Sequence, residues 1–166
     1  MTNLRINIVL LLLLHFFTGC LASSLMKKNE TMTRQEHEAI SKLENVLDIK
    51  LSFDESEISA VDKLLVDKIS KGAISRQAIN EELYISIIVF ISQVYRRNYG
   101  GKLINLEKNE LNPTHFKCSN GKMSSSYLAL YMDLQQSSSF LQQEGYIEFI
   151  YSELVTDCED AVTRKH

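Results

Sequence analysis

The sequence predicts an α+β domain that is mostly helical, with a long buried central helix and a small antiparallel sheet or hairpin. Three observations lead to this prediction. From about residue 33, apolar residues recur at the three- and four-residue spacing of a helix face. Residues 83–91 are apolar apart from Ser86, as expected for a helix surrounded by core. After Gly100 and Gly101 the pattern changes to short segments separated by turn residues, which is typical of strands.

The first helix is predicted over residues 34–47. Thr33 and Glu36 have the spacing of a capping box, in which each side chain accepts a backbone N–H of the other residue. Apolar residues then line one face of the helix. Residues 49–53 alternate between apolar and polar, so they fit either a short strand or an extended connector.

A second helix is predicted near residues 55–70. Ser52 and Glu55 offer another capping signal, a stripe of apolar residues follows, and Gly72 is a suitable stop.

The central helix is predicted from Ser75 to about Asn98. Its apolar run contains many β-branched residues, so a buried strand is the alternative. The polar residues on both sides continue the helical pattern, and Gly100-Gly101 ends it, which favours the helix.

The sheet is predicted in the segment that follows the two glycines. Residues 102–107 read as a strand, and Asn112-Pro113 reads as a turn. Residues 115–122 read as a second strand that ends in a turn, because Asn120-Gly121 is a strong hairpin signal.

Two more helices are predicted near the C-terminus. Residues 126–136 place apolar and tyrosine side chains on one face, and residues 140–154 form the last helix, which Gly145 weakens in the middle. The charged residues 159–166 are expected to fray as a tail. The prediction is therefore one α+β domain over residues 33–158, preceded by a flexible tether over residues 20–32.

The first 19 residues have the order of a secretory signal peptide. A short polar stretch with one positive side chain, Arg5, precedes an apolar run over residues 8–17, and small residues follow. The run has about ten residues, whereas a bilayer core needs about 20. An exported precursor is therefore expected.

The end of this signal, Phe17-Thr18-Gly19-Cys20, resembles the lipobox of bacterial lipoproteins, in which small residues precede a cysteine. The resemblance implies a diacylglyceryl group on Cys20, which would become the new N-terminus, and hence a membrane partner. Leu21 in place of an aspartate implies sorting to the periplasmic face of the outer membrane in a diderm bacterium. Ordinary signal peptidase cleavage after Ala22 or Ser24 is the alternative, since the family usually has leucine where Phe17 stands.

The composition is that of a globular protein, with 45% apolar and 23% charged residues. Removal of residues 1–19 takes away Arg5 alone among the charged residues, which leaves 17 basic and 21 acidic residues and a net charge of −4. A mildly acidic chain argues against nucleic acid as a partner, because nucleic-acid binding requires a concentrated basic face.

The three cysteines are Cys20, Cys118 and Cys158. If Cys20 is acylated or removed, two remain in an oxidising compartment, and a Cys118–Cys158 disulfide leaves no odd thiol. Two separate thiols are the alternative. His115 and Cys118 have ligand-like spacing, but no second pair completes a zinc site, so no metal and no cofactor is expected.

Residues that could carry catalysis are few. His115 is the only credible general base, and the sequence lacks the common nucleophile, metalloprotease and phosphate-binding motifs. The acidic residues at 54, 55 and 57 are explained by a helix N-terminus, and Arg96 and Arg97 by a helix C-terminus. The chain has seven tyrosines and no tryptophan, and most of the tyrosines have the spacing of core positions in helices, so packing explains them first. Tyrosines at exposed positions favour protein interfaces, which leaves a bias toward binding over catalysis. We therefore expect a non-enzymatic envelope lipoprotein that binds a protein, for example an immunity protein, an inhibitor or an accessory subunit. A small envelope hydrolase that uses His115 is the alternative.

Overall fold

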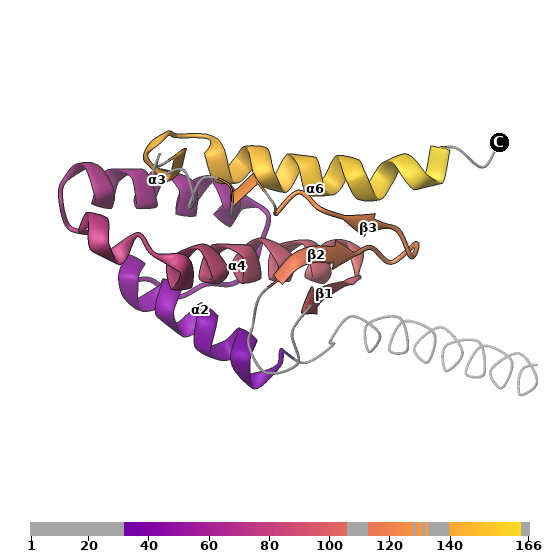
Figure 1. Cartoon of the computed structure of the whole chain (residues 1–166), viewed down its shortest axis with the longest axis horizontal. Coiled ribbons are helices and arrows are strands. Elements are labelled where there is room, and N and C mark those ends of the chain that lie inside the picture. Colours follow the sequence, from indigo (N-terminus) through magenta and orange to yellow (C-terminus); the bar gives the residue numbers. More distant parts are fainter. Residues whose placement is uncertain (1–31, 106–112, 128, 131, 133–139, 164–166) are drawn as a thin grey trace, which may run out of the picture. The chain divides into compact units, whose positions relative to one another are not determined.

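Helix α4 (Glu81–Tyr99) lies at the centre of the fold, and the other elements pack around it (Figure 1). A computed structural model of the chain describes residues 32–105, 113–127, 129–130, 132 and 140–163. Twelve residues of α4 are buried, namely all those from Leu83 to Tyr95 except Ile85. The apolar run of the sequence is therefore a helix, as predicted, and it is covered on nearly all sides.

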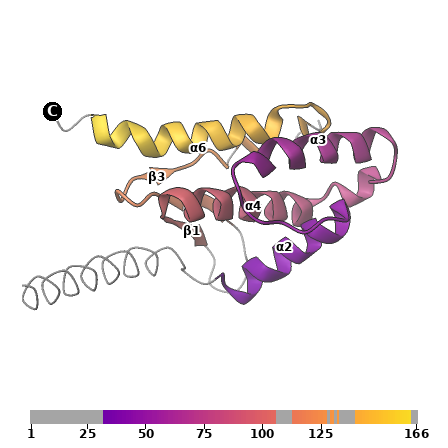
Figure 2. The same cartoon turned by 180° about the vertical axis from the view of Figure 1, so that it is seen from behind.

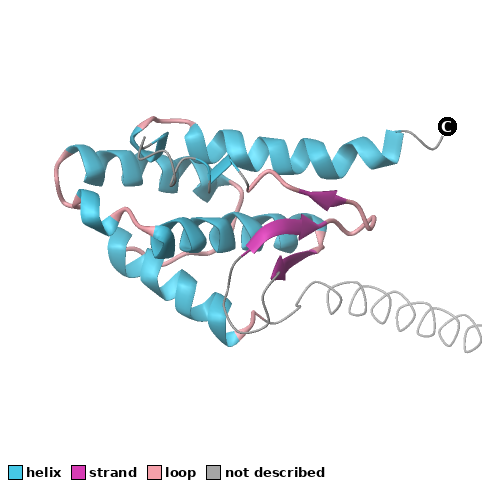
Figure 3. Cartoon of the chain, viewed as in Figure 1, coloured by secondary structure: helices cyan, strands magenta, loops and turns pink. Residues whose placement is uncertain are grey.

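Two layers of helices cover α4. Helix α2 (Arg34–Leu47) packs against α4 on one side, while α3 (Ser56–Ser70) and α6 (Tyr146–Thr163) pack against each other on the other side. A small sheet lies beside the C-terminal half of α4 and contacts α6 through its last strand (Figure 3). The prediction of a mostly helical α+β fold with a central helix and a small antiparallel sheet is confirmed.

The N-terminus of α2 is held by the capping box that the sequence predicts. The Thr33 backbone N–H donates to Glu36 Oε2 at 2.6 Å, and the Glu36 N–H donates to Thr33 Oγ1 at 3.2 Å. Glu36 is buried and also accepts from Gln93 Nε2 of α4 at 3.3 Å, while Arg96 Nη1 lies 3.6 Å from its Oε1. This network fixes the start of α2 against the C-terminal half of α4.

The segment between α2 and α3 is an extended connector, so the alternative of a strand at residues 49–53 is wrong. The expected cap of α3 by Ser52 is also wrong, because the N-cap residue is Glu55 and no side chain caps the helix. Instead Glu57 reaches back and accepts the backbone N–H groups of Ser52 and Phe53 at 2.9 and 2.7 Å. The connector is thereby tied to the first turn of α3.

Helix α4 begins later than predicted. Ser75 does not start it, because Arg76–Ala78 form a separate 3₁₀ turn. Asn80 is the N-cap, and its side chain accepts the Leu83 N–H at 3.2 Å. Asparagine in extended conformation is a strong N-cap, which explains why the continuous helical pattern is interrupted there.

The sheet has the order β1-β2-β3 and is antiparallel throughout. It consists of β1 (Lys102–Asn105), β2 (Pro113–Lys117) and β3 (Met123–Ser124). The predicted turn at residues 120–121 is confirmed by hydrogen bonds across it from the Cys118 and Gly121 N–H groups. The sequence predicted Pro113 in a turn, which is wrong. Pro113 is the first residue of β2 and lies opposite Asn105, a position where its missing N–H is tolerated. The predicted strand end at 106–107 lies outside the described residues.

The last helix is shifted along the chain. Residues Phe140–Gln142 form a 3₁₀ turn and α6 covers Tyr146–Thr163, whereas the sequence predicted a helix over 140–154. Gly145 has φ +92°, a left-handed conformation that a right-handed helix does not contain. Gly145 therefore lies between the 3₁₀ turn and α6 and does not weaken the middle of the helix. Residues 159–163, expected to fray, continue the helix. Of the predicted helix 126–136, residues 129, 130 and 132 are helical and much of the rest lies outside the described residues.

Cys118 and Cys158 form a disulfide with their Cα atoms 5.6 Å apart, so the predicted pairing is confirmed. It joins the β2–β3 turn to α6, and two hydrogen bonds support the same junction: Asn120 Nδ2 donates to the Cys158 carbonyl at 2.6 Å, and Ser124 Oγ to Asp157 Oδ2 at 2.7 Å. With 40 residues between the cysteines, the loop-entropy model gives about 4 kcal/mol at most. Within the described residues, the buried core runs from Ala39 to Cys158.

Candidate functional site

A cluster of tyrosines and carboxylates lies where α4 ends, α3 begins and α6 passes. We call it the acidic tyrosine cluster: Tyr95 and Tyr99 of α4, Tyr151 and Glu159 of α6, and Glu55 before α3. The rings of Tyr95 and Tyr99 have centroids 4.8 Å apart, and those of Tyr95 and Tyr151 are 6.5 Å apart. Three segments that are distant in the sequence thus contribute to one surface.

Hydrogen bonds to Glu55 organise the cluster. Tyr151 Oη donates to Glu55 Oε1 at 2.5 Å, and Tyr99 also hydrogen-bonds to this carboxylate. One exposed glutamate therefore orients two phenol groups from two different helices. A charge-assisted bond of this kind is about twice as strong as a neutral one.

The cluster extends from the core to the surface. Tyr95 is buried and its ring meets Phe116 of β2 edge-on, with centroids 5.3 Å apart. Tyr151 is half-buried, and Tyr99 is 43% exposed. The buried ring supports the two outer rings, so the exposed part of the cluster is held in place by the core.

The tyrosines stay neutral well beyond ordinary pH. Burial raises the pKa of Tyr151, and its hydrogen bond to Glu55 raises this pKa further. For Tyr99 the hydrogen bond to Glu55 is the main cause of the raised pKa, followed by burial. Burial raises the pKa of Tyr95, and the negative charge of Glu159 adds to it. The cluster therefore presents phenol hydroxyls together with two carboxylate charges.

Arg97 positions the connector that carries Glu55. Its guanidinium donates to the Ser52 carbonyl, and Nη1 lies 3.6 Å from Asp54 Oδ1. Arg96 instead lies inside, with its side chain only 11% exposed beside Glu36. In the sequence, both arginines were explained by their place at a helix C-terminus. In the structure, Arg97 binds the connector and Arg96 binds Glu36 in the interior.

The structure brings together residues that the sequence treated separately. Glu55 was attributed to a helix N-terminus and the tyrosines to packing. Tyr95 and Tyr99 are four residues apart, which places them on one face of α4. This spacing could have predicted their contact from the sequence. Nothing in the sequence pattern links them to Tyr151, because that contact depends on how α6 packs.

His115, the candidate base of the alternative enzyme, lies on β2 opposite Ile104 and is half-buried. Two surface hollows lie elsewhere on the described part of the chain. One of about 390 Å³ lies beside the end of α3, and one of about 320 Å³ lies between α2 and the start of α4. His115 lines neither of them. The second contains the Lys42–Glu82 ion pair at 3.1 Å, which neutralises both charges.

No metal centre emerges from the described part of the chain, where no group of three or more histidine, cysteine or acidic side chains could hold an ion. Cys20 and its lipobox-like surroundings lie outside the described residues, as does most of the tether. Of the predicted modifications, the Cys118–Cys158 disulfide is therefore the one that the structure places.

Within the described residues, no helix has the length and apolar character needed to span a bilayer. Comparison of the chain with protein-family models, with curated proteins and with solved structures found no match.

Proposed function

We propose that this chain is an exported lipoprotein, anchored through Cys20 on the cell envelope, that binds a protein through the acidic tyrosine cluster without catalytic turnover. An immunity protein, an inhibitor or an accessory subunit would act in this way. The observation that carries the proposal is the cluster itself: three tyrosines from two helices are held in fixed positions around Glu55 and Glu159.

Tyrosine is suited to protein interfaces because it buries a large area with few rotatable bonds and keeps a polar group available. The usual cost of binding includes about 0.5–1.5 kcal/mol for each side chain that must be immobilised. In this cluster much of that ordering is already present, since Glu55 and the Tyr95 ring fix the outer tyrosines. The two carboxylates favour a basic surface on the partner.

The experiment is photo-crosslinking in cells of the source organism. A photo-reactive phenylalanine analogue is placed at position 99, inside the cluster, and in a second strain at position 149. Phe149 is the matched control because it is an aromatic residue, 52% exposed, on the outward face of α6. We expect a discrete crosslinked protein from position 99 and none from position 149.

A second substitution tests whether the cluster's charge matters. Glu159→Lys should abolish the crosslink from position 99 while the chain keeps its abundance. Equal crosslinking from positions 99 and 149, or a crosslink that persists with Glu159→Lys, contradicts binding through the cluster.

The absence of turnover is tested by complementation of a deletion strain. His115→Ala should complement fully, because His115 lies on the sheet and is not part of the acidic tyrosine cluster. Loss of complementation by His115→Ala at unchanged abundance would favour the alternative of an envelope hydrolase, since a general base contributes about 10²–10⁴-fold to a rate.

A further inference from the structure

The face of the sheet that points away from α4 carries basic and apolar side chains. The strand pairing places Lys102 opposite Lys117 and Lys117 opposite Met123, while Ile104 lies opposite His115. We call these five residues the outer sheet face. The alternating residues Phe116 and Ser124 are buried on the inner side, which fixes the orientation of the strands.

Among the described residues, the lysines of this face have no paired carboxylate. Within the described residues, Lys102, Lys117 and neighbouring Lys122 take part in no ion pair, and Lys68 is the other such lysine. The remaining lysines of this part are paired with carboxylates: Lys42, Lys50, Lys63 and Lys71. The sheet is therefore a local basic region on a chain whose net charge is −3.

The pairing of two lysines directly across strands is itself unfavourable. Like charges in opposite positions of an antiparallel pair repel one another. Lys102 and Lys117 are both exposed, so water weakens the repulsion but does not turn it into attraction. An anionic partner would turn this arrangement into a favourable one.

Apolar side chains accompany the lysines. Met123 is 45% exposed beside Lys117, and Ile104 is partly exposed on the same face. Lysine stems lie along apolar surface while their ammonium groups remain in the polar layer, which is how side chains behave at a lipid interface. Lysine with methionine and isoleucine on one flat face fits the headgroup region of a bilayer.

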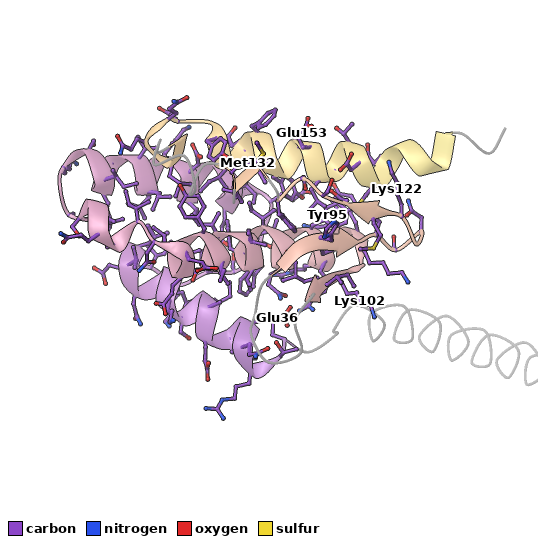
Figure 4. The ribbon with its side chains drawn as sticks, viewed as in Figure 1. Glu36, Tyr95, Lys102, Lys122, Met132 and Glu153 are labelled. Atoms are coloured by element: carbon purple, nitrogen blue, oxygen red, sulfur yellow. A yellow bond between two sulfur atoms is a disulfide. The ribbon has the colours of Figure 1, made fainter. Side chains whose placement is uncertain are left out.

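The lysines span the width of the sheet. Lys102 begins β1 and Lys122 directly precedes β3, and Figure 4 labels both. Because β1 and β3 are the two edge strands, basic side chains lie at both edges of the sheet and, with Lys117, on its middle strand.

We propose that the outer sheet face docks on an anionic lipid surface, with Lys102, Lys117 and Lys122 contacting phosphate groups and Met123 entering the headgroup layer. The orientation relative to the membrane rests on the anchor proposed above. The lipid contact itself does not, because it is made by the folded domain.

The test uses the chain from residue 20 with Cys20→Ser, which keeps the whole core and the disulfide. It is sedimented with vesicles of phosphatidylcholine alone and with vesicles that contain phosphatidylglycerol. We expect binding to the anionic vesicles at low ionic strength and its loss as salt is added. The double variant Lys102→Gln/Lys117→Gln should weaken partitioning about 30-fold, from about 5.5-fold for each lysine near an anionic surface.

The matched control is Lys42→Gln/Lys63→Gln, which removes the same charge from other faces and should leave partitioning nearly unchanged. Thermal unfolding verifies that both double variants are folded, and Met123→Ser supplies a second, uncharged change that should also weaken binding. Equal losses in the two double variants, or equal binding to both kinds of vesicle, would overturn the proposal. Binding to soluble polyglutamate as tight as to anionic vesicles would also overturn it, in favour of an acidic protein partner.

The outcome is separate from that of the proposed function. The vesicle test involves neither the acyl group nor the acidic tyrosine cluster. A failure here leaves protein binding and the Cys20 anchor untouched, and a failure of either of those leaves the vesicle result interpretable.

Discussion

Asp62 illustrates how one buried side chain can define an element that is distant in the sequence. This residue of α3 is 1% exposed, and its two carboxylate oxygens accept the backbone N–H groups of Gly145 and Ile147 at 2.5 and 2.7 Å. These N–H groups belong to the start of α6, where helical partners are missing. Asp62 therefore caps α6 from a neighbouring helix.

Asp62→Ala should lower the free energy of unfolding by roughly 2–4 kcal/mol, because one buried and one partly buried N–H group lose a charged acceptor. Chemical denaturation measures the effect. Asp67→Ala is the control in the same helix, since Asp67 makes an exposed ion pair with Lys71 that should contribute less than about 1 kcal/mol. Similar losses in the two variants would show that Asp62 does not hold α6.

Tyr127 provides a pH-dependent contribution to stability. It is fully buried, and its hydroxyl lies 2.8 Å from Ser92 Oγ, which itself donates to the Ile88 carbonyl. Burial raises the pKa of Tyr127. The folded state thus disfavours the phenolate, so the stabilising contribution is complete below the unfolded pKa of about 10 and is lost as pH rises above it.

The expected measurement is the free energy of unfolding between about pH 9 and 12. Stability should fall above pH ~10 with a slope that includes about 1.4 kcal/mol per pH unit from Tyr127. Tyr127→Phe should cost about 1 kcal/mol at neutral pH for the lost hydrogen bond and should reduce that slope by one proton's share. An unchanged slope in Tyr127→Phe would refute the assignment.

At the scale of elements, the junction between α4 and β1 depends on two glycines with different tasks. Gly100 ends the helix as its C-cap with φ +79°, as the sequence indicates. Gly101 has φ +98°, and a Cβ there would lie 2.6 Å from the Lys117 carbonyl oxygen and 2.6 Å from the Phe116 ring. The strand can approach β2 only because position 101 has no side chain.

Gly101→Ala should therefore destabilise the domain by roughly 2–5 kcal/mol, from backbone strain and from the clash together. Gly121→Ala is the control, because Gly121 has a similar φ of +88° but nothing within 4 Å of a Cβ. It should cost only about 1–2 kcal/mol. Thermal unfolding of the two variants measures the difference, and equal costs would mean that the close contact at Gly101 is easily relieved.

The elements also show where sequence patterns succeed. The helix 34–47 and its capping box were predicted because every signal is local: Thr33, Glu36 and the apolar stripe lie within one segment. The start of α4 was placed too early because Ser75 and Asn80 are both good caps, and only packing decides between them. The range of α6 was wrong because its start depends on Asp62, which lies more than 80 residues away.

The candidate site could be predicted only in part for the same reason. The residue types of the acidic tyrosine cluster were noted in the sequence, and the Cys118–Cys158 pairing followed from counting cysteines. The contact of Glu55 with Tyr151, however, joins α3 to α6 across 96 positions. No periodicity within one segment contains that information.

At the scale of the whole domain, the outer sheet face and the connector that carries Glu55 lie on different sides of α4. Figure 1 shows the sheet in front of the C-terminal half of α4, and Figure 2, from behind, shows the connector between α2 and α3 on the near side of α4. That connector ends at Glu55 of the acidic tyrosine cluster. A domain that rests on lipid with its outer sheet face would direct the acidic tyrosine cluster away from the membrane, where a protein partner can reach it.

This arrangement depends on the anchor, which leads to a prediction for the full chain. Three lysines and one methionine hold a protein on a membrane only weakly, and even a single acyl chain gives marginal binding, whereas two chains give a stable anchor. Wild-type protein should therefore sediment with membranes, and its intact mass should correspond to a chain that starts at Cys20 with a diacylglyceryl group. Cys20→Ser should shift the protein to the soluble fraction and leave only the salt-sensitive contact of Lys102 and Lys117.

Phe17→Leu is the control substitution, since it brings the segment closer to the usual lipobox and should preserve acylation. A soluble wild-type product that starts at Ser23 or Leu25 would show cleavage by ordinary signal peptidase, and the outer sheet face would then be the remaining means of membrane contact.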